Sequence, residues 1–226
     1  MVCYGMTRAL MIVVMTLGAA NAAGARTVPA EASFEAFASN TSGCAPTVSV
    51  CLGLDLHVVV KDSGPVQSAE WFARQLEAVN EHFSALGVGF ELTGVHRLAP
   101  RFAVISDRRA RDRLGRKAYT RGTVHVFLVE HLDDIHEPGE RYGVHWRDQR
   151  FPRRHWVVVA RDAPQWVLAH EIGHFFGLMH SNYPISIMNK LPRANPPESE
   201  RGFAGPEIII MRRILRRMLR SGELVL

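Results

Sequence analysis

Residues 170–180 read His-Glu-Ile-Gly-His-Phe-Phe-Gly-Leu-Met-His. On a helix, His170 and His174 lie four residues apart, so both imidazoles project from one face at a separation that a single Zn²⁺ can bridge. Gly177 tolerates the left-handed backbone that ends a helix, and the turn predicted there returns His180 to the same metal as a third ligand. Because structural zinc is usually closed by four protein ligands, three histidines and one open position indicate a catalytic zinc site.

Glu171 directly follows the first histidine. This position predicts a general base that accepts a proton from a water molecule whose pKa the metal lowers. The alternative interpretation is an amphipathic helix that carries satisfied core histidines. That interpretation explains neither the glutamate nor the third histidine beyond the glycine, so the sequence favours a hydrolytic zinc centre.

The histidine pattern and the turn behind it resemble the metzincin clan of zinc endopeptidases. The turn reads Ser186-Ile187-Met188-Asn189. In the clan, the methionine at the place of Met188 forms a hydrophobic base under the zinc ligands; ordinary core packing is the alternative role. The specific resemblance covers residues 156–189.

Within the clan, Ser181 after the third histidine is similar to the matrixin pattern. Astacins and serralysins carry a tyrosine two residues after the turn methionine, and this chain has Lys190 there. Tyr183 lies at a different place, in the connecting loop, either as a wall residue or as a stabiliser of the tetrahedral intermediate.

The resemblance implies an α+β fold. It has a mixed, twisted sheet and two main helices in an upper subdomain, residues 51–177. A small, mostly helical lower subdomain follows, residues 178–226, with zinc in the cleft between them. By element order, the edge strand along which an extended peptide binds is residues 142–146, which are Tyr142, Gly143, Val144, His145 and Trp146.

The N-terminus reads as a secretory signal, residues 1–22. Arg8 precedes the apolar residues 9–17, which are too few to span a bilayer, and Ala20-Asn21-Ala22 is a small-residue cleavage site. A retained membrane anchor is the competing interpretation. Residues 23–50 lack a sustained period and predict a loose tail or short pro-segment. The expected product is a secreted or periplasmic monomer without a stable membrane span.

The remaining cysteines fit an oxidising compartment. Cys3 leaves with the leader, so Cys44 and Cys51 remain as a pair, for which the sequence predicts a disulfide. Matrixins are often kept latent by a pro-segment cysteine that occupies the open zinc position. A latch formed by Cys44 is therefore the alternative, although the residues around it lack the arginine and glycine-aspartate of the family's latch.

Hydrophobic patterns predict the other elements. Strands are expected at residues 52–60, 89–98, 124–129 and 155–160, and a helix at 66–86 that ends at Gly87. Asp162 is the predicted N-cap of the zinc helix. A helix near the C-terminus has Ile208, Met211, Ile214, Leu215, Met218 and Leu219 on one side and five arginines on the other.

The composition argues against a disordered chain. Apolar residues make up 47% of the sequence and charged residues 22%, and the net charge is +5, which fits one ordinary globular domain. The arginine-dense residues 107–121 predict a solvated helix or loop and no nucleic-acid binding, because no aromatic platform accompanies them. The basic C-terminal helix has two readings, a solvated face or a surface that recruits an anionic substrate or envelope. Residues 131–137 offer ligands for a structural Ca²⁺ or a second Zn²⁺ besides the single catalytic ion.

The sequence thus predicts a zinc-dependent endopeptidase with an extended peptide or protein as substrate. One alternative keeps the zinc chemistry and hydrolyses a cell-wall cross-link. Another is a zinc-dependent binding protein without catalysis, against which the intact Glu171 argues, because a scaffold needs no general base.

Overall fold

A computed structural model of the chain describes residues 30–39 and 44–226; the predicted signal, residues 1–22, lies outside them. The strands are β1 (Val50–Lys61), β2 (Gly64–Pro65), β3 (Val88–Leu98), β4 (Val104–Ile105), β5 (Val124–Val129), β6 (His131–Leu132), β7 (Gly143–Arg147) and β8 (His155–Ala160). The α-helices are α1 (Ala30–Ser39), α2 (Ala69–Phe83), α3 (Arg108–Ala118), α4 (Val167–Phe175) and α5 (Gly205–Ser221). Single turns of 3-10 helix occur at Ser84–Leu86, Pro100–Phe102 and Glu198–Glu200.

The main sheet has six strands and is mixed. β3, β1, β5 and β8 are parallel neighbours in that order. β7 pairs antiparallel with β8 and forms the edge, while β2 makes a short antiparallel hairpin with the end of β1. Every residue of β5 and β8 is buried, which is why both read as nearly continuous apolar runs. The predicted α+β fold with a mixed sheet is confirmed.

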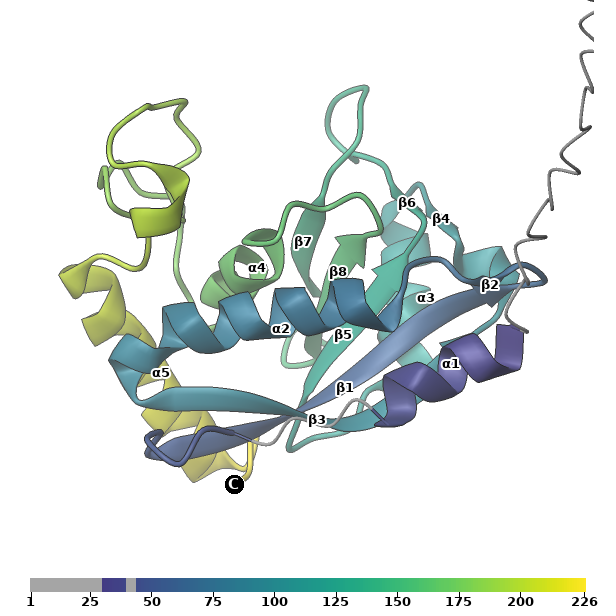
Figure 1. The fold of residues 1–226 in the computed structure, drawn as a ribbon, viewed down its shortest axis with the longest axis horizontal. Helices are drawn as coiled ribbons and strands as arrows, with labels where there is room; N and C mark the ends of the chain where they lie inside the picture. The colour runs from purple at the N-terminus through teal and green to yellow at the C-terminus, as the bar shows by residue number, and fades with distance from the viewer. Residues whose placement is uncertain (1–29, 40–43) are drawn as a thin grey trace, which may run out of the picture.

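Helices cover both faces of the sheet (Figure 1). α2 and α4 pack on one face, over the core that includes Leu54 and Leu56 of β1. α3 lies on the other face, over Phe127 and Trp156. Two apolar cores therefore hold the sheet, and α4, which carries the first two histidines, is fixed by the first of them.

The predicted helix at residues 66–86 is α2 followed by a 3-10 turn. It begins at Ala69 because the Ser68 hydroxyl accepts a hydrogen bond from the Trp71 N–H at 3.2 Å. It ends where predicted, at Gly87, which has a φ of 75°.

Residues 30–39 form α1, so the loose tail was wrong for them, and the alternative of a short pro-segment stays a hypothesis. Phe37 is buried, and its ring centroid lies 6.4 Å from that of Phe72 in α2. Phe34 packs against the same core. Phe34 and Phe37 lie three residues apart, so one face of a short helix turns both toward the core. Two apolar residues are too few to show a helical period in the sequence.

Two further predictions differ from the structure. Asp162 is not the N-cap of the zinc helix, which begins at Val167 with Trp166 as its N-cap, because separate turns at Ala163 and Val167 extend the link from β8. The arginine-dense segment is helical, but α3 is not simply solvated. A Cβ on Gly115 would lie 2.2 Å from the Trp156 ring, so the glycine lets α3 bury one face against the sheet.

α5 is the helix predicted near the C-terminus. Its buried residues include Met211, Leu215 and Met218, whereas its arginines are exposed: Arg212, Arg213, Arg216, Arg217 and Arg220. It is therefore docked through its apolar side, and recruitment of an anionic surface stays a hypothesis. Across the described part of the chain, no helix has the length and apolar character needed to cross a bilayer.

Cys44 and Cys51 form the predicted disulfide. For a chain that begins after the predicted signal, and so without Cys3, we expect two thiols to become available only after reduction. Closing this short loop contributes about 2.5 kcal/mol to the free energy of unfolding in the loop-entropy treatment. Intact mass after alkylation, with and without reductant, tests the pairing, and urea unfolding of the Cys44→Ser/Cys51→Ser variant tests the stability. Free thiols without reduction, together with activation by a mercurial, would support the latch instead.

Candidate active site

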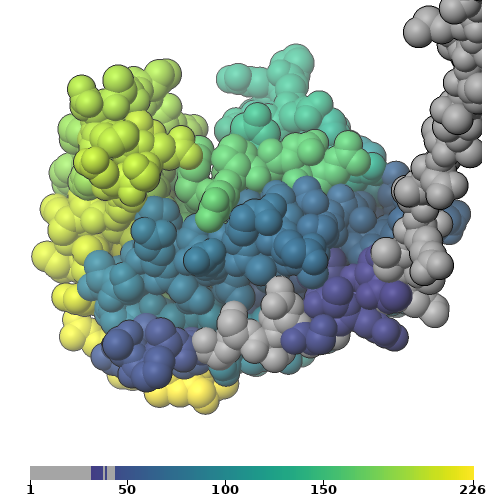
Figure 2. Space-filling view, in the orientation of Figure 1, coloured from purple at the N-terminus to yellow at the C-terminus, as the bar shows by residue number. Residues whose placement is uncertain are grey.

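A cleft of about 720 Å³ opens beside α4. One wall is made by β7 and the preceding loop, which includes Asp134 and Arg141; the other includes His180 and Lys190. Figure 2 shows the hollow between the teal projection of residues in the 130s and the lime lobe near residue 190. The three predicted histidines and Glu171 all line this cleft.

The histidine nitrogens converge. Nε2 of His174 lies 3.1 Å from Nε2 of His170 and 3.1 Å from Nε2 of His180. Nitrogens bound to one zinc at about 2.0 Å in a tetrahedron are separated by roughly 3.3 Å, so the observed spacing is close to that of a ligand set. Among the described residues, the three form one of two groups that could hold a metal; the other contains the disulfide cysteines.

Hydrogen bonds fix which nitrogens are free. Nδ1 of His170 donates to the carbonyl of Ile187 at 2.8 Å, and Nδ1 of His174 donates to that of Leu178 at 2.7 Å. Their Nε2 atoms therefore carry lone pairs that face each other, as the nitrogens of a metal-ligand set do. Burial lowers the pKa of His170 to about 4, which favours the neutral form that a metal needs. The donor set fits zinc.

Gly177 ends the zinc helix as predicted. Its φ is 85°, and a Cβ there would also lie 3.2 Å from Ile214 of α5. The turn brings Leu178 back over the last turn of α4, where its N–H donates to the carbonyl of Gly173 at 3.0 Å. The carbonyl of Leu178 accepts the hydrogen bond from Nδ1 of His174. The glycine turn therefore orients His174 and also brings His180 back to the other histidines.

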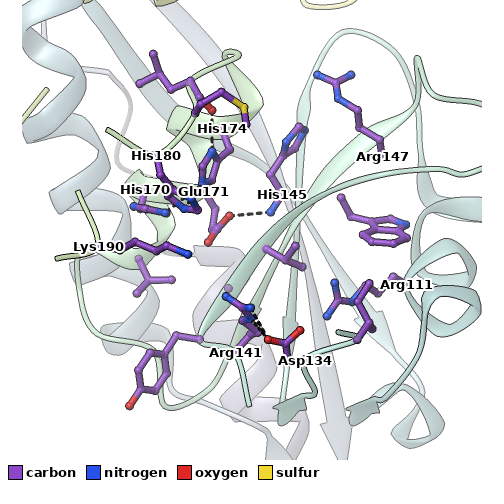
Figure 3. A pocket seen from close by; sticks show the side chains of 18 of the residues that line it. Arg111, Asp134, Arg141, His145, Arg147, His170, Glu171, His174, His180 and Lys190 are labelled. Carbon is purple, nitrogen blue, oxygen red and sulfur yellow. Dashed lines mark hydrogen bonds and ion pairs between the residues drawn. The ribbon is translucent and has the colours of Figure 1, made fainter. Parts of the chain in front are cut away.

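Glu171 lies between the histidines and β7 (Figure 3). It is 7% exposed, and its Oε2 accepts a hydrogen bond from the His145 N–H at 2.7 Å. Burial raises the pKa of Glu171 to about 7, against the opposing effect of that hydrogen bond. A Cβ on Gly143 would lie 2.8 Å from Cγ of Glu171, so this glycine provides the space for the carboxylate beside the strand.

The predicted edge strand at 142–146 is β7, shifted by one residue to Gly143–Arg147. The Tyr142 carbonyl accepts from the N–H of Ala160, so main-chain groups alternate toward β8 and away from it. Gly143, His145 and Arg147 therefore present theirs to the outer edge. Of the predicted strand residues, all five line the cleft.

A partly buried hydrogen-bonded chain holds β7 in place, and nothing in the sequence pattern indicates it. Nε2 of His145 lies 2.8 Å from Nδ1 of His155 in β8, and Nε2 of His155 lies 2.6 Å from a carboxylate oxygen of Glu223. Because the carboxylate accepts, His155 donates to it through Nε2 and in turn accepts from His145. The chain links the C-terminal segment to the strand residue whose N–H binds Glu171.

Met188 is fully buried in the turn after the histidines. A Cβ on Gly173 would lie 2.8 Å from its sulfur, so the methionine packs against α4 at Gly173, which lies between His170 and His174 in the sequence.

Glu207 connects this turn to α5, and the sequence analysis did not predict its role. This buried carboxylate accepts from the Ser186 hydroxyl at 2.7 Å and from the Ala204 N–H at 2.7 Å. The sequence does contain a signal for this role: Glu207 lies three residues after Ala204, the residue that caps α5, which is the position of the glutamate in a capping box.

Replacing Glu207 by Ala should leave the Ser186 hydroxyl and the Ala204 N–H without their acceptor. Each unsatisfied buried group costs about 1–3 kcal/mol, so we expect the free energy of unfolding to fall by roughly 2–4 kcal/mol. Urea unfolding measures this loss. Glu200→Ala, an exposed glutamate of the nearby 3-10 turn, is the matched control. Equal unfolding midpoints for the two variants would contradict the proposed anchor.

The remaining predicted residues lie elsewhere. Tyr183 is not among the described residues that line the cleft, and its carbonyl accepts from the Asn189 side chain. In the loop at 131–137, Nε2 of His131 lies 3.0 Å from Asp133 and 3.5 Å from Glu140. These three do not meet the spacing of a metal-ligand group within the described residues, so a second ion there stays a hypothesis.

The fold is similar to that of a solved bacterial metalloproteinase, and the chain carries three histidines that could hold a metal ion. The family described as Matrixin matches residues 139–201, which contain β7, the histidines and the methionine turn. Metalloproteinase-II from Bacteroides fragilis has a similar fold, with a TM-score of 0.50 and 15% identity. The alignment covers 80% of this chain and 60% of the Bacteroides protein, so this chain spans less than two thirds of the length of that protein.

Archaemetzincin from Methanopyrus kandleri aligns at 19% identity and a TM-score of 0.48, over 74% of this chain and 96% of that one. A search of curated proteins finds no match. The comparisons thus show a similar fold and a Matrixin match over residues 139–201, which include the three histidines.

Proposed function

We propose that this chain is a secreted or periplasmic zinc endopeptidase. The observation that carries the proposal is the convergence of three histidine Nε2 atoms beside a buried carboxylate in an open cleft. The disulfide supports an oxidising compartment. A bound zinc ion would be held by His170, His174 and His180, and it supplies Lewis acidity that polarises a carbonyl and lowers the pKa of water.

Glu171 is the proposed general base. Its carboxylate accepts the proton of the attacking water and returns it to the leaving amine. The raised pKa suits this double role, because a group that titrates near neutrality both takes and gives a proton at working pH. The His145 N–H keeps one carboxylate oxygen in place, leaving the other available to the cleft.

The outer edge of β7 is the proposed binding site for substrate. The carbonyl and amide groups that Gly143, His145 and Arg147 turn away from β8 can pair with an extended peptide. One of them, the His145 N–H, is already engaged by Glu171. Main-chain pairing of this kind supplies affinity for many sequences, so selectivity has to come from side-chain contacts in the cleft.

The test is hydrolysis by the purified, zinc-loaded protein of an unfolded protein and, separately, of purified cell wall. Peptide products identified by mass spectrometry from the unfolded protein support an endopeptidase. Release of cell-wall fragments alone would assign the same zinc chemistry to a cross-link amidase. Zinc binding without hydrolysis of either would make the chain a binding protein.

A further inference from the structure

Arg111 is a buried cation in the wall of the cleft. It lies on α3, is 3% exposed, and lines the cleft beside β7. Its Nη2 donates to the carbonyl of Asp133 at 2.6 Å, and its guanidinium stacks on Trp146 at 5.1 Å. Its Nε has no hydrogen-bond partner, and within the described chain it forms no ion pair.

A buried guanidinium without a counter-ion is costly. Arginine stays protonated in proteins, so the charge persists, and desolvation lowers the pKa of Arg111 because burial disfavours that charge. Asp134, an acidic group of this wall, is held by Arg141, whose Nε donates to it at 2.7 Å. One carboxylate therefore serves two arginines, and the wall keeps an excess of positive charge.

Lys190 adds a second unpaired cation from the opposite side. It is exposed, lines the cleft, and has no ion pair among residues 44–226. Figure 3 shows its nitrogen directed toward Glu171, with Arg141 and Arg111 on the facing wall. It lines the same cleft as Glu171 and the three histidines.

We infer that Arg111 and Lys190 form a subsite that receives a carboxylate of the peptide substrate. The inference rests on the proposed function and adds a substrate class to it. The carboxylate comes either from an Asp or Glu side chain next to the cleaved bond or from the free C-terminus of a short peptide. Arg111 offers it a buried positive charge and Lys190 a point charge that donates hydrogen bonds, in a cleft whose walls screen charge less than bulk water does.

The test uses fluorogenic peptides matched in pairs. Cleavage sites are first mapped in a digest of unfolded protein. Each pair then differs only by Glu against Gln at one position beside the cleaved bond, or by a free C-terminus against an amide. We expect kcat/KM of the parent to favour the charged member of one pair by at least about tenfold, or about 1.4 kcal/mol. The pair that shows the preference identifies the source of the carboxylate.

Lys190→Gln should reduce that preference to about threefold or less, because the glutamine has no charge to attract the carboxylate. Arg111→Gln should act in the same direction; if it unfolds, Lys190→Gln decides. Arg213→Gln, on the exposed face of α5, is the matched control and should keep the full preference. Raising salt from about 0.05 to about 0.5 M should lower the preference of the parent.

Two results would overturn the subsite. In the first, the parent cleaves charged and neutral peptides equally. In the second, the preference survives in Lys190→Gln; if both members of a pair then lose activity equally, the lysine takes part in the rate step instead. Failure to cleave any peptide would instead overturn the proposed function itself.

Discussion

Glu171→Gln should be nearly inactive while it still binds zinc. The amide oxygen can accept the His145 N–H as the carboxylate does at 2.7 Å, so the edge strand keeps its contact. The amide cannot take up a proton, and general-base help contributes on the order of 10²- to 10⁴-fold in rate. We therefore expect kcat/KM to fall by that factor and Glu171→Ala to fall by at least as much.

The comparison between the two variants separates chemistry from positioning. Zinc content by metal analysis should equal that of the parent in both, because no metal ligand is removed. Glu81→Ala, an exposed glutamate on α2, is the control for handling and folding. If Glu171→Gln kept most of the parent's turnover, the carboxylate would act by holding β7, and the proposed mechanism would be wrong.

His180→Ala should lose zinc. The other two histidines lie on one rigid helix, but His180 reaches them only through the turn at Gly177, with its Nε2 3.1 Å from that of His174. Removing an outer-shell partner costs roughly 10- to 100-fold in metal affinity, and removing a ligand should exceed that. Hydrolysis should fall together with zinc content.

Competition with a chromogenic chelator gives the zinc dissociation constant of each variant. His96→Ala, an exposed histidine on β3, is the control, and its affinity should match the parent's. A His180→Ala protein with parental affinity would exclude the three-histidine site. Added zinc at millimolar concentration should restore part of the structure of the site but little activity, since two ligands hold the ion loosely.

Much of the site was predictable because its residues are close in the sequence. A helix fixes the spacing of His170 and His174, and a glycine with a positive φ is the common way to end it, so the three histidines that could hold a metal follow from local geometry. β5 and β8 were predicted at their exact bounds, because a strand buried on both faces is apolar throughout.

Local rules misled where tertiary contacts took over. Asp162 has the residues of a helix start around it, yet α4 begins five residues later. α3 has the composition of a solvated helix, yet Gly115 lets it pack on Trp156. α1 lies in a segment without an extended period, and burial of Phe37 beside Phe72 gives it a place. In each case packing against a distant residue decided the outcome.

The sequence by itself determined the kind of metal site, the candidate base and the class of fold. Only the tertiary structure decided what surrounds them: the His145–His155–Glu223 chain, the Glu207 anchor, and the cations Arg111 and Lys190 facing one cleft. The physical reason is range. A helical motif encodes distances over one or two turns, whereas these contacts join residues whose separation in space depends on how sheet and helices pack.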